Sequence, residues 1–145
     1  MKEIEDEEWR HRALVGEMLS EVGANPSRLR EMKAWFIGHS LSFLCFVSGW
    51  FAPMYAAGKL ESRNIREYEL AARLALEAGC SEFVDCLLAM AEVEWEHEHY
   101  FRTQVLSHSF SQWIPVWPLP PPKENIRSSL IDFVVDFRRR EARRN

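Results

Sequence analysis

Apolar residues recur every three or four positions along most of this chain, while alternation with a period of two is absent. Because a helical turn takes 3.6 residues, this spacing puts apolar side chains on one helix face and predicts an all-α fold. Asn25 and Ser81 are the expected N-caps, and Gly79 is expected just after a helix end. The predicted helical segments are residues 2–22, 26–58, 60–78, 82–107 and 124–140.

The length of 145 residues fits a single domain built around one core. We expect a helical bundle over residues 1–108, a connector rich in Pro and Trp over 109–123, and an amphipathic C-terminal docking helix over 124–145 that ends in the basic tail Arg138 to Arg144. The net charge of −4 is mild and argues against nucleic-acid binding. Three cysteines without a paired spacing, and no signal-peptide pattern, favour a reducing, cytoplasmic location.

The most apolar part of the chain, Ala34 to Gly58, is close in length to a membrane-spanning helix. It is interrupted by His39, several serines, Gly49 and Pro53, and a proline kinks or breaks a helix. We therefore predict that this segment is a buried central helix of the bundle.

Three Glu-x-x-His spacings occur. Glu96 to His99 lies on a largely polar stripe and is expected to be solvated, so Glu8 to His11 and Glu94 to His97 are the two candidate motifs. Residues three apart share a helix face, so both side chains of a motif can reach one metal ion. Each pair also interrupts an apolar stripe, where a charged carboxylate is costly unless it is paired or binds a metal. The apolar positions of these stripes are Ile4, Val15, Met18 and Val22 in the first segment, and Leu87, Met90, Phe101 and Val105 in the fourth.

Glu61 is the candidate carboxylate from the third segment, because its stripe of Met54, Ala57, Ile65, Tyr68 and Ala72 is otherwise apolar. Glu67 and Tyr68 are candidates for groups that support the metal ligands. Four further titratable residues of the fourth segment are expected to lie on a solvated face; they are Glu92, Glu96, Glu98 and His99. Carboxylate and imidazole ligands together favour two iron ions, with manganese as an alternative.

This order of motifs resembles that of the ferritin-like di-iron proteins, and residues 3–106 are most similar to the demethoxyubiquinone hydroxylase family. The resemblance implies a ferritin-like antiparallel bundle and iron ligands at Glu8, His11, Glu61, Glu94 and His97. It rests on both Glu-x-x-His motifs, the apolar run from Ala34 to Gly58, Leu60-Glu61 and Glu67-Tyr68. The family has a His-Tyr pair where this chain has Glu67-Tyr68. It also has a first helix with a further Glu, which this chain lacks before Glu8.

The expected function is therefore that of a di-iron oxidase or hydroxylase, which uses O₂ on a lipophilic small molecule such as a quinone. Rubrerythrin-like handling of iron or peroxide and a non-catalytic interaction module are the alternatives. A truncated segment or a second subunit is expected to supply the missing wall, so a homodimer that completes the bundle is predicted. The apolar run and the basic C-terminal helix also suggest peripheral membrane contact.

Overall fold

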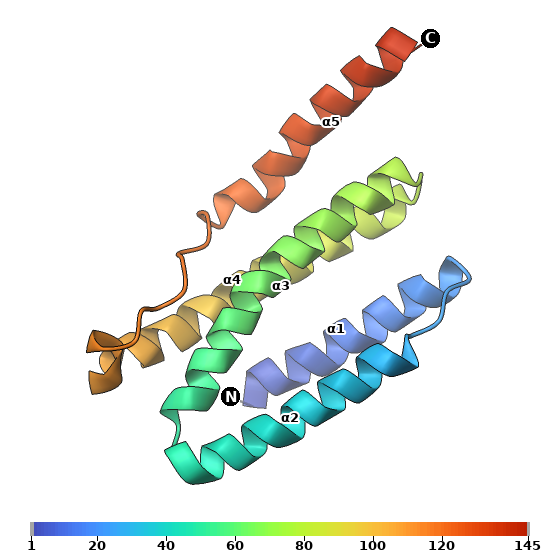
Figure 1. Cartoon of the computed structure of the whole chain (residues 1–145). Coiled ribbons are helices and arrows are strands. Elements are labelled where there is room, and N and C mark those ends of the chain that lie inside the picture. The colour runs from blue at the N-terminus through green and yellow to red at the C-terminus, as the bar shows by residue number, and fades with distance from the viewer. Residues whose placement is uncertain (1, 145) are drawn as a thin grey trace.

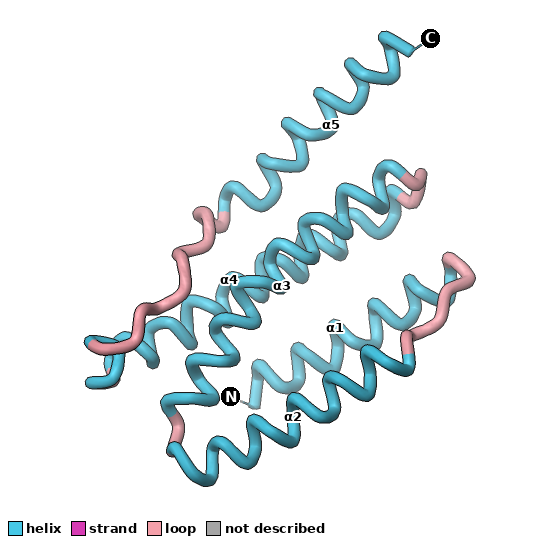
Figure 2. Tube along the Cα trace, in the orientation of Figure 1, coloured by secondary structure: helices cyan, strands magenta, loops and turns pink. Residues whose placement is uncertain are grey.

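The computed structural model describes the backbone of residues 2–144, and all side chains in that range except those of residues 41, 42, 44, 47, 48, 136–138 and 140–144. Over this part of the chain every regular element is a helix, as the sequence predicts. The basic tail falls largely on undescribed side chains, so that prediction lies outside the described residues. The elements are α1 Lys2–Glu21, α2 Arg28–Ser48, α3 Phe51–Glu77, η1 Ser81–Phe83, α4 Val84–Ser107, η2 Ser109–Gln112 and α5 Glu124–Arg144 (Figure 1 and Figure 2).

The helices form a bundle of two hairpins with α5 along one side (Figure 1). In the first hairpin α1 turns into α2 at Gly23, and in the second α3 turns into α4 at Gly79. Both glycines have φ near +70° to +80°, a left-handed conformation that side chains disfavour. The two hairpins meet along α1, α3 and α4, which is where the candidate ligands lie.

Three predicted helix starts are wrong, and the largest error is in α3, which begins at Phe51 and not at residue 60. The second helix begins at Arg28 rather than after Asn25, and Ser81 lies in a short 3₁₀ turn that precedes α4. The long apolar run is also divided, because Gly49 takes a positive φ of 69° and separates α2 from α3. Pro53 then falls in the first turn of α3, where a missing backbone N–H leaves no helical hydrogen bond unmade.

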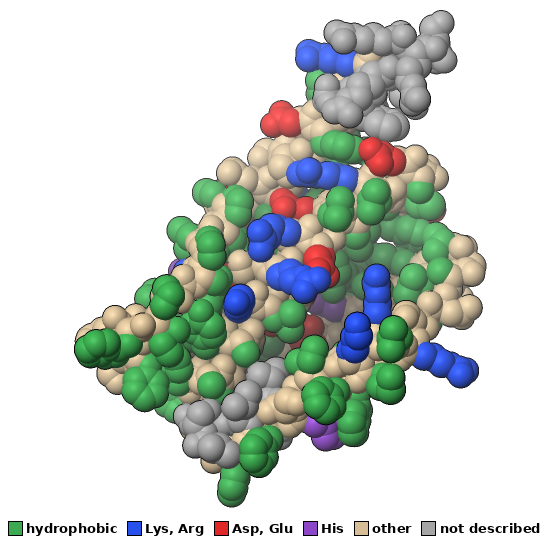
Figure 3. All heavy atoms as spheres, in the orientation of Figure 1, with side chains coloured by type: hydrophobic (Ala, Val, Ile, Leu, Met, Phe, Trp, Pro, Cys, Tyr) green, Lys and Arg blue, Asp and Glu red, His purple; other side chains and the backbone are tan. Residues whose placement is uncertain are grey.

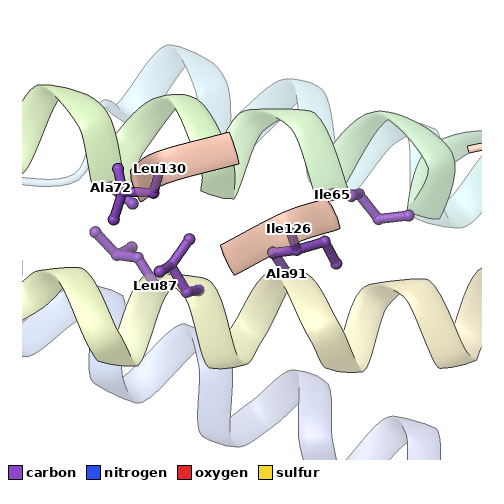
Figure 4. Close-up of a cluster of buried hydrophobic side chains, with 7 residues drawn as sticks. Ile65, Ala72, Leu87, Ala91, Ile126 and Leu130 are labelled. Atoms are coloured by element: carbon purple, nitrogen blue, oxygen red, sulfur yellow. The ribbon is translucent and has the colours of Figure 1, made fainter. Parts of the chain in front are cut away.

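The main core lies between α3, α4 and α5 (Figure 4). Ile126 and Leu130 project from α5 between the other two helices, so the C-terminal helix docks on the bundle as predicted. The buried members of this core are Ile65, Ala72, Leu87, Leu88, Ala91, Ile126 and Leu130.

The prediction that the apolar second segment is a buried central helix is wrong for α2. Trp35, Phe36 and Ile37 follow one another around the helix, yet their exposed fractions are 63%, 66% and 55%. Phe46 is 91% exposed. An apolar run specifies a tendency to be buried but not the surface that buries it. None of the helices, as far as their residues are described, is long and apolar enough to cross a membrane.

Candidate metal centre

The two Glu-x-x-His motifs, on α1 and α4, face each other across the bundle. His11 Nδ1 lies 3.3 Å from Glu94 Oε1, and His97 Nδ1 lies 3.5 Å from Glu8 Oε1. Each motif therefore places its imidazole beside the carboxylate of the other. Helical spacing of three residues makes this crossed arrangement possible, because Glu and His of each motif point the same way.

Helix α3 completes the cluster with Glu61. One ligand atom from each of Glu8, Glu61, Glu94 and His97 lies within 4.8 Å of the others. Asn64, one turn after Glu61, donates from Nδ2 to Glu61 at 3.0 Å and to Glu94 at 3.4 Å. The amide thus holds the two carboxylates side by side. Four of the five predicted ligands thus form one group, and His11 lies beside it through its contact with Glu94.

The cluster is largely shielded from water. Glu94 is fully buried, and His11, Glu61 and His97 are each at most 6% exposed. The side chain of Glu8 is more accessible, with 42% of its surface exposed. Buried carboxylates are normally paired with a cation, so this arrangement is costly when both acids are ionised.

Burial changes the proton affinity of these groups in the expected directions. Burial, followed by the proximity of Glu94, raises the pKa of Glu61 to about 9, and burial also raises the pKa of Glu94. Burial lowers the pKa of His11. For His97 burial opposes the charged form, but the carboxylates of Glu8 and Glu7 prevail and raise its pKa to about 9. Without a metal, protons must therefore balance the negative charge.

Two buried polar atoms in the cluster, Glu8 Oε1 and His97 Nδ1, make no hydrogen bond among the described residues and face each other at 3.5 Å. A carboxylate oxygen and an imidazole nitrogen are both ligand atoms of the kind that bind transition metals. Donors around one ion lie about 3–4.4 Å apart because metal–ligand bonds are about 2.0–2.2 Å long. The observed spread of 4.8 Å needs only small side-chain movements to reach that range. The residues therefore fit a metal ion.

Sequence reasoning missed two members of this cluster. Glu7 accepts a hydrogen bond from His97 Nε2 at 2.7 Å, although it precedes the apolar stripe position of Glu8. Asn64 also contacts the cluster, and a polar residue one turn from a candidate ligand is the signal that would have identified it. Both side chains act on ligands by hydrogen bonding, as is usual around metal sites.

The two proposed supporting residues have different positions. Glu67 is an exposed side chain that pairs with Arg63 at 2.5 Å, so the structure does not bring it to the cluster. Tyr68 packs edge-on against His11, with ring centroids 6.0 Å apart. Burial, and then the Glu94 carboxylate, raises the pKa of Tyr68, which keeps its phenol protonated.

The expected solvated face of α4 holds only in part. Glu98 is 1% exposed, in contrast to the prediction, because the connector covers it. Its Oε1 accepts hydrogen bonds from Arg102 Nε at 2.9 Å and from Trp117 Nε1 at 2.6 Å. Glu96 and His99 are exposed as predicted, and Glu92 is partly buried where it pairs with Arg127.

A cavity of about 370 Å³ lies beside the cluster, between α1, α2 and α3. Glu8, His11 and Tyr68 line one wall, and Val15 and Leu19 are among its apolar side chains. A small molecule bound there would lie next to the candidate ligands.

Fold and site together define an all-helical bundle with a buried carboxylate–histidine cluster that can hold a metal ion. Comparison with known proteins gives no match to a family model, to a curated protein or to a solved structure.

Proposed function

We propose that this chain is a ferritin-like di-metal protein that uses two iron ions and O₂ to oxidise a lipophilic small molecule. The observation that carries the proposal is the pair of orphaned donor atoms, Glu8 Oε1 and His97 Nδ1, in a cluster of buried carboxylates. In helical bundles, two Glu-x-x-His motifs together with carboxylates from other helices form the ligand set of a dinuclear site. This chain has both motifs and Glu61.

Glu8, His11, Glu61, Glu94 and His97 would hold the ions, and manganese is the alternative metal for this ligand set. Two bound iron ions would supply the electrons needed to reduce O₂. The chain itself orients the ligands and excludes water. Asn64 fixes two carboxylates, and Glu7 is placed to orient the His97 ring through its Nε2.

The cavity beside the cluster supports a small-molecule substrate. Its volume of about 370 Å³ falls within the range of ligand pockets, about 300–1,000 Å³. Val15, Leu19 and Pro26 give it apolar surface, which suits a lipophilic ring or chain. The protonated phenol of Tyr68 is a donor that a quinone-type oxygen could accept from.

Helix α2 gives no carboxylate or imidazole to the described cluster, and its aromatic side chains are exposed. We propose that a second copy of the chain covers these side chains. Peripheral membrane contact through the same face is the alternative.

The test is metal analysis of protein purified from aerobic, iron-rich culture. We expect two irons per chain and O₂ uptake after anaerobic reduction, and we expect a lipophilic quinone to be hydroxylated or its quinol to be oxidised. The double variant Glu94→Gln/His97→Asn should lose iron affinity by about tenfold or more, because both residues are ligands. Circular dichroism checks that this variant keeps its helices.

A second Glu-x-x-His pair on the same helix provides the matched control. Glu96 and His99 have the same spacing but are exposed. The variant Glu96→Gln/His99→Asn should keep both irons and full O₂ uptake. Wild-type protein without iron, or equal iron in both variants, would reject the proposal. Peroxide turnover without quinone turnover would instead favour iron or peroxide handling.

A further inference from the structure

A second cavity, of about 430 Å³, lies between α3 and the connector of residues 109–123. Leu60 and Ile65 form its α3 side, and Trp117 and Leu119 face them from the connector together with three prolines. The cavity is therefore mostly apolar. The candidate metal ligands do not contribute to its described lining, so it is a separate feature of the molecule.

The charged side chains that line this cavity are Lys59, Arg63 and Arg66, all of them cations. They are four and three residues apart on α3 and so share one face of the helix. Arg63 pairs with Glu67. Lys59 and Arg66 have no anionic partner among the described residues, and no acidic side chain lines the cavity. Figure 3 shows Lys and Arg side chains gathered over the middle of α3.

The connector wall is held in place without a ligand. Trp117 is 6% exposed, donates to Glu98, and accepts at its carbonyl from Arg102 Nη1 at 3.1 Å. Its ring fills the space above Gly58, where an added Cβ would lie 2.4 Å from it. A fixed wall lowers the entropic cost of binding, because the protein does not have to order the cavity first.

We propose that this cavity binds a single-chain amphiphile with an anionic head group. The phosphate or carboxylate lies among Lys59, Arg63 and Arg66, and the alkyl part lies against Leu60 and the connector. A volume of about 430 Å³ suits a drug-sized molecule, not a two-chain phospholipid. Charge complementarity selects the anion, since bringing like charges together on one helix face is unfavourable unless an anion offsets them.

Isothermal titration with octyl phosphate, kept below its micelle concentration, tests this assignment. We expect one site per chain, and we expect Lys59→Gln/Arg66→Gln to weaken binding by about tenfold or more. The matched control is Arg30→Gln/Lys33→Gln, which removes the same charge from exposed positions on α2 and should leave the affinity unchanged. All substituted side chains are exposed, so the fold should survive.

Three further probes separate the sources of binding. Octyltrimethylammonium, which has the same chain and the opposite charge, and inorganic phosphate, which has no chain, should both bind much more weakly. Equal affinity for either, or binding only to phosphatidylglycerol vesicles, overturns the proposal. Protein treated with a chelator should bind octyl phosphate equally well, so this result is independent of the metal centre.

Discussion

Burial makes the ionised forms of Glu61 and Glu94 unfavourable unless a cation lies between the two carboxylates. The pKa of Glu61 is about 9 in the fold against 4.5 in the unfolded chain, so between these pH values the folded state holds a proton that the unfolded state has lost. His97, with its pKa raised from 6.5 to about 9, acts in the same direction, and His11, with a lowered pKa, opposes them. Stability of the metal-free protein should therefore be lost as pH rises from 6.5 to 9.

Thermal unfolding of chelator-treated protein at these two pH values measures this effect. Glu61→Gln should stabilise the metal-free protein at pH 9 by about 1–3 kcal/mol relative to wild type, because it removes a buried charge. At pH 4.5 or below the variant should lose this advantage. Added Fe²⁺ or Mn²⁺ should stabilise the wild type most at high pH, where the ligands are deprotonated. A difference between wild type and variant that does not change with pH contradicts a role for the buried carboxylate charge.

At Gly58 the connector packs directly against α3. A Cβ there would lie 2.4 Å from the Trp117 ring and 2.9 Å from Phe101 Cβ. We expect Gly58→Ala to cost about 1–3 kcal/mol of unfolding free energy through overpacking. Gly38→Ala in α2 is the control, since an added Cβ meets nothing within 4 Å there. It should be neutral or stabilising by about 0.5–1 kcal/mol, because Ala favours helix.

At the scale of the element, a buried ion pair fastens the connector to α4. Glu98 accepts from Arg102, and Arg102 in turn donates to the carbonyls of Trp117 and Pro118 at 3.1 Å and 3.0 Å. Glu98→Gln leaves the guanidinium without its anion, which should cost about 3–5 kcal/mol. Glu96→Gln, two residues away on the same helix and exposed, should change stability by less than about 0.5 kcal/mol. Denaturant unfolding of both variants compares the two sites; equal effects would contradict a fastening role.

The same elements explain how far sequence patterns predict this molecule. The helical period gives the five helices, and polar residues inside apolar stripes identify Glu61, Glu94 and His97, because those stripes face a core that each helix helps to build. The helical pattern wrongly predicts an exposed Glu98, because the burial of Glu98 depends on Trp117, nineteen residues away. It also fails for Glu7, which binds His97 from beside the stripe across ninety residues of chain. Contacts distant in sequence leave no local pattern.

At the scale of the whole molecule, α2 leaves an apolar surface that one chain does not cover. Leu29, Met32, Trp35, Phe36 and Phe46 are all more than half exposed. Exposed apolar patches of this kind usually mark an interface with protein or membrane. Because we propose that a second copy of the chain covers this surface, the protein should sediment as a dimer in the absence of lipid.

Substitutions on α2 should distinguish a dimer interface from a membrane-binding surface. Trp35→Glu/Phe36→Glu/Phe46→Glu places charge where the proposed interface excludes water, so it should produce a monomer with unchanged helix content. Leu119→Glu, at an equally exposed apolar position on the connector, should stay dimeric. If the wild type is a monomer that floats with lipid vesicles, and the triple variant does not, α2 is a membrane surface instead. In the proposed dimer the partner's helix helps to enclose the metal centre, so the monomeric triple variant should hold less iron than the wild type. Metal analysis of the triple variant measures this directly.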